Sequence, residues 1–123
     1  MKLNPECIRD ILIEIESNTG YQSRWTFDES TVESGILSRY TYEEFAYHIS
    51  QCDKAGLIDD YNSYDFGESG VVSDLSPYGH EFLANIRTDT VWNKLKATGT
   101  TSLPILFNLA KDFALAYFQG RIL

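Results

Sequence analysis

Residues 59–66, DDYNSYDF, hold the densest group of side-chain oxygens in the chain and are the first candidate for a calcium loop. An EF-hand loop needs oxygen ligands at alternating positions, glycine at the sixth position and glutamate at the twelfth. Counted from Asp60, the sixth residue is Asp65 and the twelfth is Val71. Since both positions fail, we expect no metal site in this stretch.

The histidines and cysteines are the other candidate metal ligands, and they are His48, His80, Cys7 and Cys52. No pair has the Cys-x-x-Cys or His-x-x-x-His spacing of a zinc site. His48 precedes Cys52 by four residues on one predicted helix face, a spacing compatible with ligation and with packing alike. We expect packing, with both cysteines as buried free thiols in a reducing compartment, and no cofactor.

Motifs that place a catalytic group are also missing from the sequence. There is no nucleophile elbow, phosphate-binding Walker loop or dinucleotide-binding glycine pattern. The carboxylate pairs Glu14/Glu16 and Asp59/Asp60 are explained as solvated side chains. We therefore predict that the protein is not an enzyme and has no catalytic residues.

Aromatic side chains interleaved with acids are the more informative pattern. Aromatic residues rimmed by carboxylates suit a surface that binds a partner protein. Tyr61, Tyr64 and Phe66 form such a set in a hairpin predicted over residues 57–75. The outward face of a helix predicted from Tyr42 to about Ala55 supplies the other candidates. The candidate partner-binding residues are Tyr42, Glu43, Tyr47, Gln51, Lys54, Tyr61, Tyr64 and Phe66.

The net charge of −8 is unevenly distributed. Residues 1–87 carry 6 basic and 16 acidic residues, whereas residues 88–123 carry 4 and 2. The predicted 42–55 helix has a net charge of −2 and the 57–75 hairpin one of −5. DNA binding relies on several cationic phosphate contacts, so this surface disfavours DNA. A DNA-binding regulator would have to use Arg24, Arg39 or the basic residues Arg87, Lys94 and Lys96.

Start and stop signals predict the helices that position these residues. Asn4-Pro5 begins a helix that stops at Gly20, and a capping box of Thr41 and Glu44 begins the helix that Gly56 ends. Further helices are predicted from Ser76-Pro77, with Tyr78, Phe82, Leu83 and Ile86 inward, from Thr88, and from about Leu103 to Gln119. A short helix is predicted within residues 28–40.

Strand signals complete the expected architecture. Alternation over residues 21–28 places Tyr21, Ser23, Trp25 and Phe27 on one face of a short, half-buried strand. Leu57 and Ile58 begin the hairpin, which turns through residues 62–70 and returns over 71–75. A helix that runs through Gly-Leu-Ile into a two-stranded hairpin predicts an α+β, mostly helical fold with a winged helix-turn-helix core and additional C-terminal helices. The expected division is a winged-helix domain of residues 1–98 and an apolar helix of residues 103–119.

Four runs of the sequence resemble a known family: LNPECIRDIL, YTYEEFAYHISQCDKAGLI, DLSPYGHEFLANIR and DTVWNKLK. The family is an uncharacterised, phage-associated group of small bacterial winged-helix proteins, classed as a domain of unknown function. The resemblance covers roughly residues 1–97. It implies a phage or mobile-element setting, and it implies no activity and no catalytic residues.

The predicted 103–119 helix is apolar around most of its circumference, whereas a surface helix needs only one apolar stripe. Burial on two sides is therefore expected, with the same helix of a second copy as the partner. Attachment to a membrane surface is disfavoured because the polar stripe is narrow and nearly neutral. The candidate dimerisation residues are Leu106, Leu109, Phe113 and Tyr117.

Together these features predict a cytoplasmic, non-enzymatic regulator or adaptor that is homodimeric and binds an unidentified protein. The polar N-terminus argues against a signal peptide, and no apolar run reaches the length of a membrane span. A DNA-binding transcriptional regulator is the alternative. A further alternative is an acidic DNA mimic that inhibits a nucleic-acid enzyme.

Overall fold

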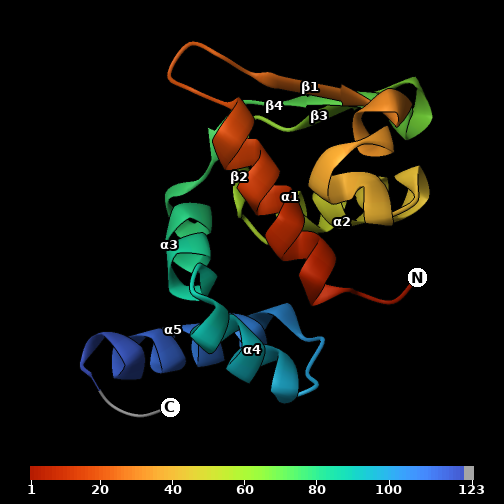
Figure 1. Cartoon of the computed structure of the whole chain (residues 1–123). Coiled ribbons are helices and arrows are strands. Elements are labelled where there is room, and N and C mark those ends of the chain that lie inside the picture. The colour runs from red at the N-terminus through yellow and green to blue at the C-terminus, as the bar shows by residue number, and fades with distance from the viewer. Residues whose placement is uncertain (121–123) are drawn as a thin grey trace.

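The computed structural model describes residues 1–120. A small sheet lies at one end of two central helices, residues 5–18 and 42–54, a third helix lies alongside them, and the last two helices lie at the end opposite the sheet (Figure 1). The helices are α1 (Pro5–Asn18), α2 (Tyr42–Lys54), α3 (Pro77–Ile86), α4 (Asp89–Ala97) and α5 (Leu103–Phe118). The strands are β1 (Trp25–Asp28), β2 (Ile58–Asp59), β3 (Asn62–Tyr64), β4 (Ser69–Val72) and β5 (Asp74–Leu75). Three short 3₁₀ helices are η1 (Glu29–Glu33), η2 (Gly35–Arg39) and η3 (Asp65–Gly67).

The helix starts confirm the capping signals read from the sequence. The Thr41 hydroxyl accepts a hydrogen bond from the Glu44 amide at 3.1 Å, and the Glu44 carboxylate accepts one from the Thr41 amide at 3.0 Å. The side chain of Asn4 caps α1 by accepting a hydrogen bond from the Glu6 amide at 3.0 Å. These bonds satisfy amides that a helix leaves without internal partners, and so they fix where each helix begins. Gly56 follows the last turn of α2 with φ of 77°, the left-handed conformation that commonly terminates a helix.

The sheet differs from the single long hairpin that the sequence predicted. Its order is β1-β4-β3, all antiparallel, with Trp25 opposite Val72 and Asn62 opposite Val71. β2 and β5 form a separate two-stranded ladder. Residues 62–64 were expected to lie in a turn, but they pair with β4, which leaves a tight turn over residues 65–68. The pairing of β1 with β4 joins segments more than forty residues apart.

Three further predictions were wrong in part. The strand expected over residues 21–28 begins only at Trp25, because Gly20 and Ser23 pair with each other in a turn and leave Tyr21 fully exposed. The helix expected within residues 28–40 is the pair η1 and η2. Tyr78, expected on the inner face of α3, is 44% exposed, although its ring packs edge-on against Phe107.

One hydrophobic core joins the sheet to α1 and α2. Trp25 and Phe27 of β1 pack against the ring of Phe45 from α2, with ring centroids 6.0 and 5.1 Å apart. The aliphatic residues Ile8, Ile11, Leu12 and Ile15 of α1 are all buried beside them. This packing fixes the inner face of α2 and leaves its other face toward solvent.

Cys7 and Cys52 are free and buried, as the sequence predicted. Burial, helped by the charge of Asp10, raises the pKa of the Cys7 thiol from its usual 9.0 to about 12, and burial also raises that of Cys52. The unfolded thiols ionise near pH 9 while the folded ones stay protonated.

We therefore expect the free energy of unfolding to fall as the pH rises from about 8 to about 10, because only the unfolded chain then releases thiol protons. Urea unfolding at a series of pH values measures this effect. A variant with both cysteines replaced by alanine should show a smaller slope. An unchanged slope in that variant contradicts the expectation.

The C-terminal helix α5 packs on α3 and α4. Its inner face carries Leu106, Ala110 and Ala114, each at most 2% exposed, and the Phe107 ring lies 4.7 Å from that of Phe82. Leu106 is thus part of the intramolecular core, which corrects its assignment to a dimer surface. Leu109 and Phe113 pack partly against the core, and Tyr117 is 39% exposed.

Within residues 1–120, no helix has both the length and the apolar character needed to cross a bilayer.

Candidate functional site

An open groove of about 800 Å³ lies between the solvent face of α2 and the turn that joins β3 to β4. We call it the aromatic groove. Its lining residues are Met1, Phe27, Tyr42, Glu43, Ala46, Tyr47, Ser50, Tyr61, Ser63, Phe66, Gly67 and Glu68. The volume lies within the range of roughly 300–1,000 Å³ that is typical of ligand sites.

The helical wall of the groove follows from the period of α2. Tyr42, Ala46 and Ser50 are four residues apart and so lie one above the other on one face. Phe45 and Ile49 alternate with them in sequence and are fully buried on the opposite face. The packing of the inner face therefore determines which side chains line the groove.

The strand wall follows from the two-residue period of a β-strand. Tyr61 and Ser63 point to the groove, whereas Tyr64 lies on the other side of the sheet, beside a separate depression. The Tyr61 ring stacks on Phe27 with centroids 6.3 Å apart and planes 4° from parallel. The hydroxyl of Tyr42 donates a 2.7 Å hydrogen bond to the Gly67 carbonyl. These two contacts fasten the hairpin to β1 and to α2.

The turn at the mouth of the groove has an unusual backbone. Asp65 and Phe66 have φ values of 52° and 56°, in the left-handed region that residues other than glycine rarely occupy. Gly67 follows with φ of 91°. The Phe66 side chain is completely exposed, at 109% of its reference area. A left-handed conformation costs an L-residue roughly 1–2 kcal/mol, and no burial of Phe66 offsets it.

The aromatic groove is negatively charged. Glu43 of α2 and Glu68 of the turn lie on opposite walls, and the lining residues include no lysine or arginine. Burial raises the pKa of Tyr42, and the neighbouring Tyr61 and the carboxylates of Asp28 and Glu68 raise it further. Burial also raises the pKa of Tyr61. A negative potential over aromatic rings attracts cations and repels phosphate.

The structure brings together five of the eight candidate partner-binding residues: Tyr42, Glu43, Tyr47, Tyr61 and Phe66. Gln51 and Lys54 lie outside the groove lining, and Tyr64 belongs to the other face of the sheet. Sequence reasoning missed Ala46, which the helical period would have found, and it placed Ser50 on the outward face of the helix without making it a candidate. It also missed Phe27, for which the sequence holds no signal, because its place depends on the β1–β4 pairing.

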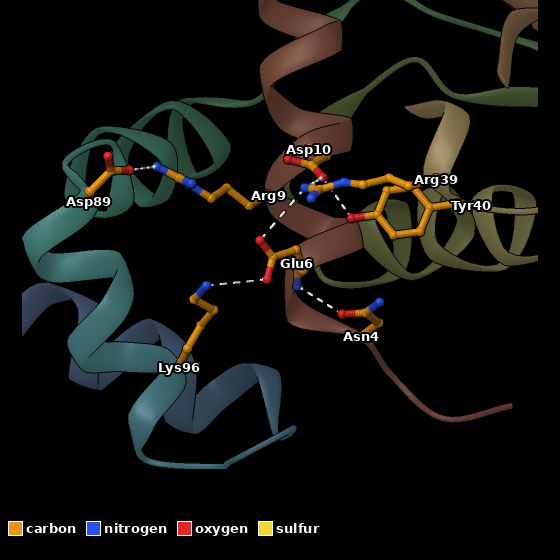
Figure 2. A network of polar contacts seen from close by, with 8 residues as sticks. All are labelled: Asn4, Glu6, Arg9, Asp10, Arg39, Tyr40, Asp89 and Lys96. Atoms are coloured by element: carbon orange, nitrogen blue, oxygen red, sulfur yellow. Dashed lines mark hydrogen bonds and ion pairs between the residues drawn. The ribbon is translucent and has the colours of Figure 1, made fainter. Parts of the chain in front are cut away.

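A polar cluster separate from the aromatic groove joins α1 to η2, in the segment before α2 (Figure 2). Asp10 is buried, at 3% exposed. Its carboxylate accepts one hydrogen bond from the Tyr40 hydroxyl at 2.6 Å and another from the Arg39 guanidinium. Glu6 lies 3.6 Å from Arg39 and 3.5 Å from Lys96 of α4. Burial and the hydrogen bond to Asp10 raise the pKa of Tyr40, so this phenol is a donor at neutral pH. The cluster connects three elements by contacts internal to the chain, and we assign it a structural role.

We expect Asp10→Asn to destabilise the fold by about 2 kcal/mol, measured by urea unfolding. The substitution keeps the side-chain volume but weakens charge-assisted hydrogen bonds, including the one that satisfies the buried Tyr40 hydroxyl. Asp89→Asn is the matched control, since Asp89 is 89% exposed and lies 3.6 Å from Arg9. It should cost less than about 0.5 kcal/mol. Equal losses in the two variants would contradict the structural role of Asp10.

The side chain of His48 is occupied at both ring nitrogens. Nε2 accepts a hydrogen bond from the Asn4 amide at 2.8 Å, and Nδ1 lies 2.6 Å from the Glu44 carbonyl, to which it donates. His48 thus links the start of α1 to α2 as a neutral ring. Over residues 1–120, no three His, Cys, Asp or Glu side chains are grouped closely enough to hold a metal ion.

Comparison with known proteins gives two matches. A family model described as "Hypothetical protein (DUF2513)" matches residues 2–102. An uncharacterized protein of Haemophilus influenzae is 34% identical over 116 residues, which cover 93% of this chain and 92% of that protein. No solved structure matches the chain. The family match includes the whole aromatic groove except Met1, and it ends where α5 begins.

Proposed function

Because this chain belongs to the DUF2513 family, whose description names no activity, we propose its function from the groove: it is a non-enzymatic interaction protein that binds a segment of a partner protein. The binding site is the aromatic groove. The role is that of a regulator or adaptor, and the family resemblance favours a phage or mobile-element setting.

Our proposal includes a winged helix-turn-helix arrangement for the N-terminal part. The element order supports it: α1, β1, the η1–η2 segment, α2 and then the β3–β4 hairpin, with β1 paired to β4. In such proteins the second helix of the motif and the hairpin form the recognition surface. Here these are α2 and β3–β4, the two walls of the aromatic groove.

The exposed, strained Phe66 is the observation that carries the proposal. Strained backbone persists where surrounding structure enforces it, and it concentrates at functional sites. A fully exposed aromatic residue at the mouth of an aromatic groove also matches the anchors that dominate protein interfaces. In the free protein the Phe66 ring buries no surface. Its burial against a partner would offset the conformational cost of the strained turn.

Charge favours a protein partner over DNA. The groove presents Glu43 and Glu68, and much of the basic complement is engaged elsewhere. Arg39 pairs with Asp10 and Glu6, Arg87 lies 2.6 Å from Glu16, and Lys96 lies 3.5 Å from Glu6. Counterion release at DNA needs several free cations on one surface, and the α2–hairpin surface offers only Lys54.

Selection from a display library of random peptides tests the proposal. We expect peptides that bind the full chain and Tyr21→Ala but not Tyr47→Ala. Tyr47 lines the groove, whereas Tyr21 is equally aromatic, fully exposed and outside it. Circular dichroism checks that both variants are folded. Failure to enrich any peptide that depends on Tyr47 would contradict a peptide-binding groove.

A parallel titration tests the rival function. Fluorescence anisotropy with labelled duplex DNA should show no binding at physiological salt. Binding that weakens steeply with salt and is lost in Lys54→Ala would overturn the proposal in favour of a DNA-binding regulator.

A further inference from the structure

We propose that the aromatic groove receives a cationic side chain, preferably arginine, from an extended segment of the partner. This inference rests on the proposed function and specifies the chemistry that the groove recognises. Three independent features support it: the accessible aromatic rings, the two carboxylates of the lining and the free edge of β3.

Four rings of the groove are accessible to a cation: the partly exposed Tyr42, Tyr47 and Tyr61 and the fully exposed Phe66. The fifth ring, Phe27, is 4% exposed and is stacked against Tyr61. The chain forms cation–π contacts elsewhere, with Arg9 and Lys96 at Trp92, Arg39 at Tyr40 and Lys94 at Phe113. Over residues 1–120, no such contact involves a groove ring. Aromatic faces carry negative potential and attract a guanidinium or ammonium group brought within about 6 Å.

The carboxylates add a directional component to this attraction. Glu43 of α2 and Glu68 of the turn both line the groove, so a cation bound there is attracted by two negative charges. The raised pKa of Tyr42, to which nearby carboxylates contribute, is consistent with that potential. A guanidinium group stacks flat on a ring while its edge donates hydrogen bonds to carboxylates, which lysine cannot do. For this reason arginine is the preferred occupant.

The edge strand β3 accounts for the extended form of the partner. In the sheet order β1-β4-β3, β3 has a neighbour on one side only within the described chain. All three of its residues, Asn62–Tyr64, are exposed, and none is a lysine or proline that would block pairing. An added strand would pair with this edge and direct alternate side chains toward the groove, beside Ser63.

A pair of matched small probes tests the inference without a known partner. N-acetyl-arginine N-methylamide carries the cation, and N-acetyl-citrulline N-methylamide is its neutral isostere. In NMR titrations of the full chain, arginine should shift the ring signals of Tyr42, Tyr47 and Tyr61, and citrulline should bind about tenfold more weakly. Added salt should weaken the binding of arginine.

Variants of the carboxylates supply the second readout. The double variant Glu43→Gln, Glu68→Gln should bind the arginine probe about fivefold more weakly. Glu81→Gln removes an exposed carboxylate outside the groove lining and should change nothing. Thermal unfolding checks that both proteins remain folded.

The outcomes separate the inference from the function on which it rests. Equal shifts with arginine and citrulline, or no shift with either, would overturn the cationic occupant. If the display selection still returns Tyr47-dependent peptides that lack arginine and lysine, peptide binding stands and the inference fails. If neither the selection nor the titration gives a signal, both are wrong.

Discussion

Phe66→Gly should stabilise the protein by about 0.5–1 kcal/mol and weaken binding of any groove-dependent peptide by at least about thirtyfold. Glycine occupies the left-handed region without the steric cost that a phenylalanine bears there, and only part of this gain is lost to the greater freedom of the unfolded chain. Since the Phe66 ring is completely exposed, its removal forfeits no core contact. Loss of an interface anchor commonly costs about 2 kcal/mol or more of binding free energy.

Two measurements on the same variant test the two parts of this prediction, the gain in stability and the loss of affinity. Urea unfolding reports the change in stability, and isothermal titration with a selected peptide reports the change in affinity. Tyr21→Gly is the control, because it removes a fully exposed ring outside the groove and should leave affinity unchanged. If Phe66→Gly bound as tightly as the parent, Phe66 would have no role in recognition.

Gly79→Ala should destabilise the fold by about 3 kcal/mol, although alanine is the better helix former. A Cβ at position 79 would lie 2.0 Å from the carbonyl oxygen of Leu57. That carbonyl cannot move freely, because it accepts a 2.9 Å hydrogen bond from the Ser76 amide. The added methyl group therefore forces α3 away from the segment that leaves α2, at the cost of overpacking a buried contact.

Urea unfolding of Gly79→Ala beside Gly20→Ala distinguishes this close approach from an ordinary glycine effect. At Gly20 the nearest atom to a new Cβ is 3.9 Å away, so alanine there should be neutral or stabilising by up to about 1 kcal/mol. Similar effects at the two positions would show that the contact between α3 and Leu57 is looser than the structure has it.

Most of the helical framework could be predicted because its signals are local. The Thr41–Glu44 capping box and the Asn4-Pro5 start each act over a few residues, and both helices begin where these signals lie. The periodic apolar residues of α2 predicted its buried face, and with it Tyr42 and Tyr47 on the other side. The strands were less predictable, since a strand is stable only with a partner and the partner of β4 is as distant as β1.

The apolar residues of the C-terminal helix α5 show the same contrast between what the sequence predicts and what only the structure decides. Its apolar residues indicated burial on two sides, and the contacts with α3 and α4 account for one of them, including Leu106. Sequence alone could not assign each apolar residue to an intramolecular or an intermolecular contact, because both remove the same surface from water.

The sequence by itself determined where the helices begin, the free state of the buried thiols, and the acidic, aromatic character of α2 and the hairpin. Only the tertiary structure decided that these two segments face each other, that Phe27 joins them and that Tyr64 does not. It also decided that Phe66 stands exposed in a left-handed turn. The reason is physical: capping, period and charge are properties of neighbouring residues, whereas the aromatic groove exists only after the pairing of β1 with β4 and the packing of Phe45 bring distant segments together.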